Sequence, residues 1–345
     1  MKATYIERQG GPEVLTYGDL PDPSPGPGEV VIRVRATALN HLDVFARAGR
    51  NGIILDKFPH VLGCDLSGEA AELGAEVEGL RVGERVMVDY SLPCAKCRPC
   101  ISGQDQLCEI GGSIGISVDG GYAQYVVVPA QNAHTIPDDM DFDEAAAIPL
   151  VYKTAWHCLI TRCGMQAGED VLVMAAGSGV GSAAIRLAKL VGARVITTAS
   201  TEEKLAKARA LGADETINYV ENPTYSRTVR EMTGGKGVDL VFDSIGASVW
   251  DENFKSLKPG GRLVNCGVTG GHRAPLRIGR MFTEQVTLMG ASTGNRADFA
   301  KVAGLVRRGE VRGIVSRTFP LEDAAEAHRA MEGRDVFGKL VLVVP

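Results

Sequence analysis

Residues 170–204 read DVLVMAAGSGVGSAAIRLAKLVGARVITTASTEEK, and this stretch carries the strongest fold signal in the chain. Val171–Ala175 is an apolar run, which predicts a strand buried on both faces. Three glycines follow within five positions, at Gly177, Gly179 and Gly181. Glycine permits a tight turn there and allows backbone N–H groups to come close to a ligand.

A helix and a second strand complete the pattern. The predicted helix carries an apolar stripe and ends at Gly192, and Arg194–Thr198 follows as a strand, so a βαβ unit spans about 30 residues. The N-terminus of such a helix favours a pyrophosphate. We therefore predict a dinucleotide site at Ala176, Gly177, Ser178, Gly179, Val180 and Gly181. The alternative, in which the glycines only ease packing, is weaker because strand, turn, helix and strand occur in order, although the G-x-G-x-x-G match is incomplete.

The second strand lacks the acid that an NAD site uses. Such a site places Asp or Glu about 20 residues after the glycines, where it binds the ribose 2′-hydroxyl. Here the first acids are Glu202 and Glu203, and Ser200-x-x-Glu203 has the pattern of a capping box for the next helix. Hydroxyl groups followed closely by Lys204 suit a 2′-phosphate, so we predict NADP(H). The alternative is that Lys204 is a solvated helix residue.

Length and charge limit the class of protein. A chain of 345 residues predicts two domains with ample core. A net charge of −5 gives no basic surface for nucleic acid. The N-terminus, MKATYIERQGG, lacks the apolar run of a signal peptide, and no stretch approaches a membrane span, so we expect a cytoplasmic protein with no membrane partner.

The residue pattern changes near position 150. Before it, alternating stretches such as Val30–Ala36 and Arg85–Val88 predict a β-rich region, and after it helices alternate with apolar strands. The further strands expected are Glu215–Tyr219, Val238–Asp243, Arg262–Gly267 and Val286–Ala291. Six such strands predict an α/β fold with a doubly wound parallel sheet. The tail predicts a helix at Glu322–Glu332 and a strand at Lys339–Val344.

Four cysteines form the most specific motif, Cys94-x-x-Cys97-x-x-Cys100-x₇-Cys108. Four thiolates at this spacing can close a tetrahedral shell around zinc, which leaves no open position for catalysis. A ferredoxin cluster is the alternative, but its run ends in C-x₃-C-P, whereas the last gap here is seven residues. Disulfides are not expected in a reducing compartment. We predict one structural zinc per chain.

Together with Gly63-x-Asp65-x-x-Gly68, these motifs make the chain resemble the zinc-containing medium-chain dehydrogenase/reductase family over nearly its full length. The resemblance implies a GroES-like β-barrel catalytic domain at residues 1–150 and 295–345, with the Cys₄ zinc lobe at about 90–112. It also implies a Rossmann domain at 151–294 and assembly into a homodimer or homotetramer.

Alcohol dehydrogenases of this family hold a second, catalytic zinc through Cys, His and Cys, with a Glu nearby and a Ser or Thr proton relay. Matched residue by residue, Asn40 stands at the first Cys, Cys64 at the His and Leu150 at the last Cys. Asp65 replaces the Glu, and Leu42 replaces the relay hydroxyl. The resemblance therefore implies that the catalytic zinc is lost.

Asn40-x-x-Asp43 instead resembles the quinone oxidoreductase branch, which reduces quinones and enones with NADPH and no metal. In that branch the sugar–phosphate partners map onto Ser200, Lys204 and Tyr219. The chain departs from the branch because it keeps the Cys₄ lobe and has Phe45 where the branch has Tyr.

Hydride delivery to a polarised acceptor needs positioning and a hydrogen-bond donor for the developing oxyanion. The candidate residues are Asn40 as donor, Phe45 against the substrate, Thr154 beside the nicotinamide, His41 near the pyrophosphate, and Asp43 with Cys64 around them. We therefore expect NADPH-dependent reduction of a small-molecule quinone or α,β-unsaturated carbonyl. One alternative is an alcohol dehydrogenase with a different metal site, built from His41, Asp43, Cys64 and Asp65. Another is a redox-inactive NADP(H)-binding sensor.

Overall fold

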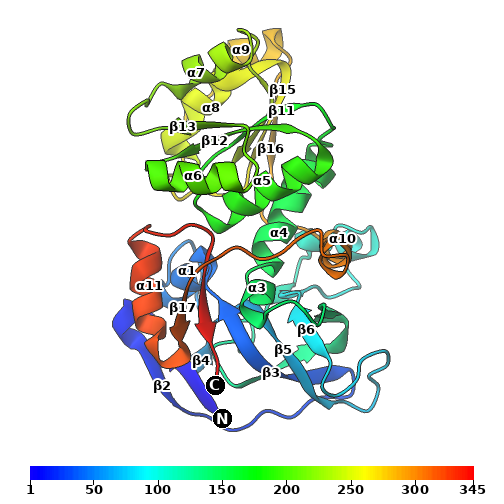
Figure 1. Ribbon diagram of the computed structural model, residues 1–345. Helices are drawn as coiled ribbons and strands as arrows, with labels where there is room; N and C mark the ends of the chain where they lie inside the picture. Colours follow the sequence, from blue (N-terminus) through cyan, green and yellow to red (C-terminus); the bar gives the residue numbers. More distant parts are fainter. The chain divides into compact units, whose positions relative to one another are not determined.

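The computed structural model describes residues 1–345, which divide into two compact units (Figure 1). One unit comprises Met1–Leu150 and Asn295–Pro345, and the other comprises Val151–Gly294. The second unit is therefore a continuous insertion into the first. None of the helices combines the length and the apolar character that crossing a membrane requires.

The inserted unit contains a six-stranded sheet in which every neighbouring pair is parallel. In spatial order the strands are β13 (Glu215–Asn218), β12 (Arg194–Ala199), β11 (Asp170–Val173), β14 (Val238–Asp243), β15 (Leu257–Asn265) and β16 (Thr287–Gly290). The order reverses at β11, where a doubly wound sheet binds its ligands beyond the carboxyl ends of the strands. The predicted doubly wound sheet of six parallel strands is confirmed.

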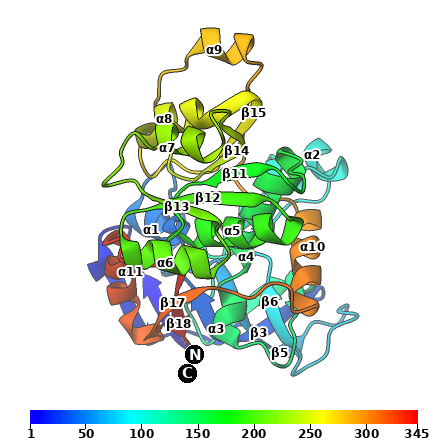
Figure 2. The ribbon, with the colours of Figure 1, turned by 45° about the horizontal axis from the view of Figure 1, so that its top comes forward.

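Helices cover both faces of this sheet (Figure 2). α5 (Gly179–Val191) and α6 (Glu202–Ala210) lie on one face, and α7 (Tyr225–Met232) and α8 (Trp250–Ser256) lie on the other. The unit also contains α4 (Pro149–Trp156), which begins at the boundary, a π-helix (His157–Arg162), a 3₁₀ helix (Ala247–Val249) and α9 (Ile278–Thr283). The buried apolar strands make the core between these layers, as their sequence predicts.

The other unit is built on a seven-stranded sheet with the order β10-β6-β5-β3-β18-β17, in which β9 also pairs with β3. Its strands are β3 (Glu29–Ala38), β5 (Asp65–Leu73), β6 (Arg85–Val88), β9 (Tyr125–Pro129), β10 (Ala133–Thr135), β17 (Val315–Pro320) and β18 (Lys339–Val343). A three-stranded sheet holds β1 (Lys2–Ile6), β2 (Leu15–Asp19) and β4 (His60–Val61), and a hairpin-like pair holds β7 (Ser91–Leu92) and β8 (Gly112–Ser113). The helices are α1 (His41–Ala48), α2 (Arg98–Ile101), α3 (Phe142–Ala146), α10 (Arg296–Arg307) and α11 (Ala324–Glu332).

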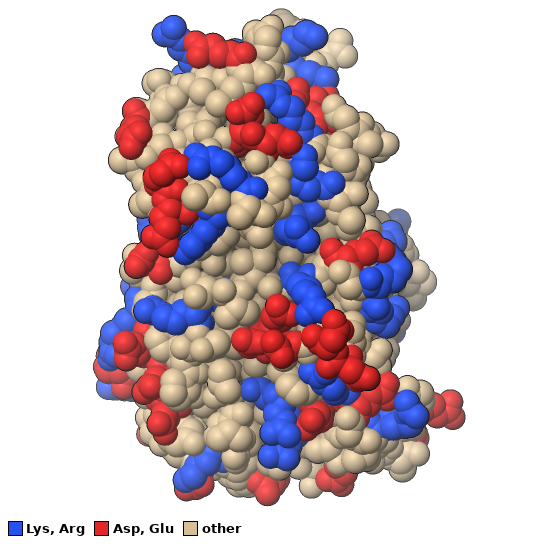
Figure 3. Space-filling view, viewed as in Figure 1, with Lys and Arg blue, Asp and Glu red and all other residues tan.

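Both segments of this unit contribute to one core. Val30 and Ile32 on β3 and Leu66 on β5 pack in the same cluster as Leu340 and Leu342 on β18. β18 pairs antiparallel with β3 and parallel with β17, so a strand from the end of the sequence lies inside the sheet of the N-terminal segment. On the face in Figure 3, acidic and basic side chains are interspersed, without a large cluster of either sign.

Several element boundaries differ from the sequence-based expectation, and three of these differences are informative. β11 ends at Val173 because Ala175 has a φ of 56°, which starts the turn. β15 begins at Leu257 rather than Arg262, since the strand continues through Pro259, Gly260 and Gly261. α6 is capped by Thr201 rather than Ser200: the Thr201 hydroxyl accepts from the Lys204 N–H at 3.3 Å. The predicted capping box is therefore wrong by one residue.

Candidate functional site

The glycine-rich turn between β11 and α5 is held by one serine. The Ser178 Oγ accepts from the Gly181 N–H at 3.0 Å and donates to the Ala175 carbonyl at 2.9 Å. Gly181 admits no side chain, because a Cβ there would lie 2.2 Å from the Ala175 oxygen. The N–H groups of Gly179 and Val180 donate to no protein acceptor and belong to the positive end of the helix dipole. The turn therefore fits a pyrophosphate.

The remaining predicted cofactor residues lie at the same edge of the sheet. Ala199 pairs with Asn218, so Ser200 and Tyr219 leave neighbouring strands side by side. Because Thr201 caps α6, the Ser200 hydroxyl is left without a hydrogen-bond partner. Lys204 is half-buried in the first turn of α6. This edge therefore brings a hydroxyl, an ammonium and a phenol into one region.

The two acids of this segment are engaged elsewhere. Glu202 accepts from Arg209 at 2.7 Å, and Glu203 accepts from Lys207 at 2.6 Å. Both pairs run along α6, so neither carboxylate is available at the end of β12.

Thr154 on α4 is a buried polar residue whose hydroxyl has no hydrogen-bond partner. A buried hydroxyl normally has one, so this orphan fits a bound molecule that supplies an acceptor or donor. Thr154 therefore remains a candidate contact for the nicotinamide.

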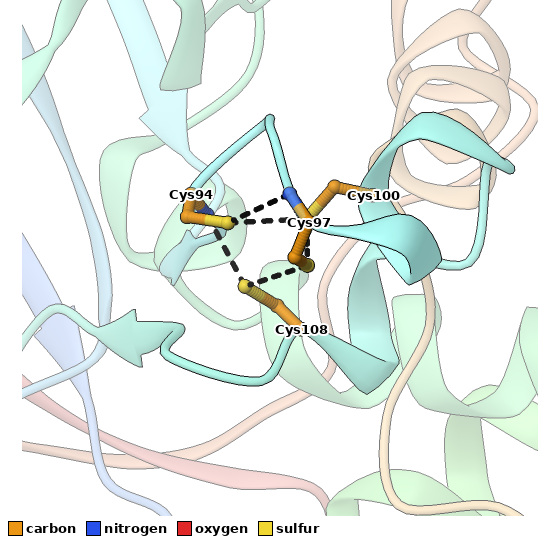
Figure 4. A group of neighbouring side chains, drawn as sticks. All are labelled: Cys94, Cys97, Cys100 and Cys108. Atoms are coloured by element: carbon orange, nitrogen blue, oxygen red, sulfur yellow. Dashed lines mark hydrogen bonds between the residues drawn. The ribbon is translucent and has the colours of Figure 1, made fainter.

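The four cysteine sulfurs converge in one cluster (Figure 4). The Sγ–Sγ distances are 3.4 Å for Cys97–Cys100, 3.8 Å for Cys97–Cys108 and 3.9 Å for Cys94–Cys100. A tetrahedral ion with metal–sulfur bonds of about 2.3 Å separates its sulfurs by about 3.8 Å. Hydrogen bonds from the N–H groups of Lys96 and Cys97 lower the pKa of the Cys94 thiol to about 6, which favours a thiolate. The cluster fits a closed tetrahedral metal site.

The cysteine lobe is attached to the start of α10. Asn295 caps this helix and donates its side-chain amide to the Gly103 carbonyl at 3.0 Å. The Arg296 N–H donates to the Asp105 carboxylate at 3.1 Å, and its guanidinium lies 3.6 Å from the same group. The lobe therefore fixes the point at which the chain re-enters the first unit.

The second predicted site lies between α1, β5 and β18. Asp43 accepts from the Asn40 N–H at 2.7 Å and from the Gly63 N–H at 3.2 Å. Burial raises the pKa of Asp43 to about 6, against these two hydrogen bonds. Burial also raises the pKa of the Cys64 thiol well above its usual value, so Cys64 is a neutral thiol here.

Sequence reasoning missed Lys339, which lies at the centre of this site. Its ammonium donates to Asn40 Oδ1 at 2.5 Å and to Asp65 Oδ2 at 2.8 Å, and the residue is 3% exposed. Asn40 Nδ2 donates in turn to Asp65 Oδ2 at 2.9 Å and to Cys64 Sγ at 3.3 Å. The available signal was a single lysine at the start of an otherwise apolar strand. We call Asn40, Cys64, Asp65 and Lys339 the lysine cluster.

The lysine cluster is not arranged as a metal site. Leu150 offers no ligand side chain, and its N–H donates to Asp65 Oδ1 at 2.8 Å, while Lys339 occupies the other oxygen. Among the His, Cys, Asp and Glu side chains of the structure, only the four cysteines of the lobe converge closely enough to share an ion. The alternative ligand set of His41, Asp43, Cys64 and Asp65 is therefore not brought together.

His41 and Phe45 lie one turn apart on α1, away from these buried groups. Their ring centroids are 6.1 Å apart, His41 is exposed and Phe45 is half-buried. Asp43, on the opposite side of the helix, is fully buried. Phe45 is thus available for packing against a ligand, whereas Asp43 holds the local backbone.

Comparisons with known proteins agree with this architecture. Residues 26–138 match the family described as "Alcohol dehydrogenase GroES-like domain", and residues 179–308 match the one described as "Zinc-binding dehydrogenase". A 2-haloacrylate reductase of Burkholderia sp is 33% identical over 99% of this chain and 98% of its own. A quinone oxidoreductase of Pseudomonas aeruginosa is 32% identical over 99% of both chains.

A solved structure described as an NAD-dependent alcohol dehydrogenase is 45% identical, covers 100% of both chains and has a TM-score of 0.96. The GroES-like domain and the Rossmann fold expected from the sequence are thereby confirmed. The chain is an oxidoreductase, and it belongs to the zinc-containing medium-chain dehydrogenase/reductase family.

Proposed function

We propose that this protein transfers hydride from NADPH to a quinone or an α,β-unsaturated carbonyl without a catalytic metal. The observation that carries the proposal is the Lys339 ammonium, bound between Asn40 and Asp65 at 2.5 and 2.8 Å. By the sequence matching, these are two of the positions around the catalytic zinc in alcohol dehydrogenases of the family. The related 2-haloacrylate reductase and quinone oxidoreductase support the same class of acceptor.

Alcohol oxidation and the reduction of an enone or quinone make different chemical demands on the enzyme. Alcohol oxidation near neutral pH needs a Lewis acid to form an alkoxide. An activated alkene or quinone makes no such demand, because its carbonyl group already polarises the carbon that accepts the hydride. The enzyme then has to orient the acceptor and stabilise negative charge on oxygen.

We assign NADP(H) as the cofactor, which supplies the hydride when bound. The Gly179 and Val180 amides would hold its pyrophosphate, and Ser200, Lys204 and Tyr219 would hold its 2′-phosphate. The engagement of Glu202 and Glu203 with Arg209 and Lys207 removes the carboxylate that would select NAD.

We also propose that the Cys₄ site holds one zinc per chain, with a structural role. Its four thiolates close the coordination shell, so the ion would stabilise the lobe without contacting substrate. Cysteines that bind a metal rather than form disulfides are typical of a reducing compartment, which fits a cytoplasmic location.

The second candidate is an alcohol dehydrogenase, favoured by the printed description of the solved structure that is 45% identical. The experiment compares NADPH-dependent reduction of 2-cyclohexenone and a benzoquinone with NAD(P)⁺-dependent oxidation of ethanol and benzyl alcohol. Each assay is repeated after mild chelation that leaves one zinc per chain. Reduction should dominate and survive chelation. Alcohol oxidation that is lost on chelation and restored by zinc would refute the proposal.

A further inference from the structure

The Lys339 ammonium has a hydrogen-bond donor to spare. An ammonium carries three N–H groups. Two of them donate to Asn40 Oδ1 and Asp65 Oδ2, and the third has no acceptor among the protein atoms. The carboxylate oxygens of Asp43 accept from the Asn40 and Gly63 backbone amides, and Lys339 makes no hydrogen bond to them.

The Asn40 side-chain amide, by contrast, has no free hydrogen-bond donor, because both its oxygen and its nitrogen already have partners. Its Oδ1 accepts from Lys339, and its Nδ2 donates to Asp65 at 2.9 Å and to Cys64 at 3.3 Å. This orientation of the amide is the only one its partners allow, because a flip would turn Oδ1 toward the carboxylate and the NH₂ group toward the ammonium. Asn40 therefore cannot fill the donor role that its sequence position suggests without first losing a partner.

We propose that Lys339 donates its third N–H to the substrate oxygen on which negative charge develops, and that Asn40 and Asp65 position it. The inference rests on the proposed function. A buried ammonium, held in place before the reaction, stabilises an oxyanion far better than a group in water. Asp65, itself fully buried, compensates the charge of Lys339 between turnovers.

The step balances for an enone. The hydride, with its electron pair, adds to the β-carbon, and the C=C π pair moves to form an enolate whose oxygen is hydrogen-bonded by Lys339. The α-carbon then takes a proton from water. The products are NADP⁺ and the saturated ketone, and Lys339 keeps all its protons.

This role makes the contribution of Lys339 depend on the acceptor. A more basic oxyanion accepts a stronger hydrogen bond from the ammonium, so enones and unsaturated thioesters need the lysine more than quinones do. A lysine that only compensated Asp65 would affect every acceptor equally.

The test measures kcat for 2-cyclohexenone, an unsaturated thioester and a benzoquinone with the variant Lys339→Met, which replaces the unbranched stem of the lysine without its ammonium. We expect a loss of about 10²–10³-fold for the enone and thioester, comparable to the removal of an oxyanion donor elsewhere, and a clearly smaller loss for the quinone. Lys339→Arg should recover part of the enone activity.

Two further variants separate catalysis from folding. Lys339→Met with Asp65→Asn removes the unpaired carboxylate, so it should restore stability but not enone reduction. Arg35→Met is the matched control: Arg35 pairs with Glu69 on β5 at 2.8 Å, outside the lysine cluster, and its loss should leave the acceptor profile unchanged.

Two results would overturn the role of Lys339 while leaving the proposed function intact. One is an equal loss for all three acceptors, and the other is full enone activity in the double variant. An unmodified protein that reduces none of the three acceptors would overturn both.

Discussion

At the scale of single residues, the proposed preference for NADPH over NADH depends on the charges at the end of β12. Lys204 lies in the first turn of α6 near an unpaired Ser200 hydroxyl, whereas Glu202 and Glu203 are paired along the helix. A charge-assisted contact to a phosphate contributes about 1.5–3 kcal/mol. Lys204→Glu should therefore weaken NADPH binding at least about tenfold and spare NADH, as measured by titration calorimetry.

The control for that variant is Lys236→Glu, which makes the same charge change at an exposed lysine just before β14, at the amino ends of the parallel strands and away from the end of β12. It should leave the preference between the cofactors unchanged. Equal affinity of the unmodified protein for NADPH and NADH would refute the cofactor assignment.

A second residue-scale feature is a buried histidine. Arg47 donates to His328 Nδ1 at 3.1 Å, and because arginine only donates, the ring proton must be on Nε2, 3.1 Å from the Tyr122 hydroxyl. Burial, followed by the charge of Arg47, lowers the pKa of His328 to about 3. The neutral ring thus joins α1, α11 and the strand-connecting segment around Tyr122.

This histidine predicts acid sensitivity. In the unfolded chain its pKa is about 6.5, so between pH 6.5 and about 3 the unfolded state binds a proton that the native state does not. Stability must therefore fall as the pH falls through that window. His328→Gln, which keeps one donor and one acceptor but does not titrate, should lose about 2–3 kcal/mol less between pH 7 and pH 4.5. Urea unfolding of both proteins at several pH values measures the difference, and parallel curves would contradict the assignment.

The cysteine site and Lys339 differ in how far the sequence predicts them. The cysteine site was predictable because its ligands lie within 15 positions of one another, so spacing alone describes it. Lys339 was not, because its partners Asn40 and Asp65 are 299 and 274 positions away. A single lysine before an apolar run is typical of a strand end. Only the pairing of β18 with β3 shows that this lysine lies beside Asn40 and Asp65.

At the scale of elements, the sequence predicted all six parallel strands, most directly β11, β12 and β14, which are buried on both faces and leave continuous apolar runs. The edge strands β13 and β16 are only partly buried. The ends of the six strands were less predictable. Glycine and proline at 259–261 are typical of a loop, yet β15 begins at Leu257. The cap of α6 was misplaced because Ser200 and Thr201 are chemically equivalent caps, and only the backbone geometry separates them.

The cysteine lobe allows an element-scale prediction. Cys97→Ser should abolish the zinc site and loosen the start of α10, because Asn295 and Arg296 are anchored on Gly103 and Asp105. Elemental analysis should fall from one zinc per chain to none, with faster proteolysis near residue 295. Cys266→Ser, outside the cluster, should retain the zinc. A metal-free unmodified protein, or one that contains iron, would contradict the prediction.

At the scale of the whole molecule, we propose assembly through the β16 edge of the parallel sheet. β16 has no neighbour on one side, and α9 beside it in the sequence exposes Ile278 and Phe282, which are 64% and 68% exposed. Replacing both with Asp should convert a homo-oligomer into a monomer by light scattering, with an unchanged circular dichroism spectrum. Val82→Asp is the control, since Val82 is equally exposed but lies in the other unit. An unmodified protein that is already monomeric would rule out the proposal.

The position of β18 also sets an order of events during synthesis. β3 and β5 leave the ribosome early, but the strand that separates β3 from β17 comes only after the inserted unit has been made. At about 5–20 residues per second, the roughly 265 residues between β5 and β18 take about 13–53 s. During that interval the Ala36–Ala38 end of one β3 edge is unpaired, because β9 covers only Glu29–Arg33 on that edge, while the inserted unit can already fold as a continuous segment. Because Lys339 arrives on that late strand, the lysine cluster is among the last parts of the nascent protein to form.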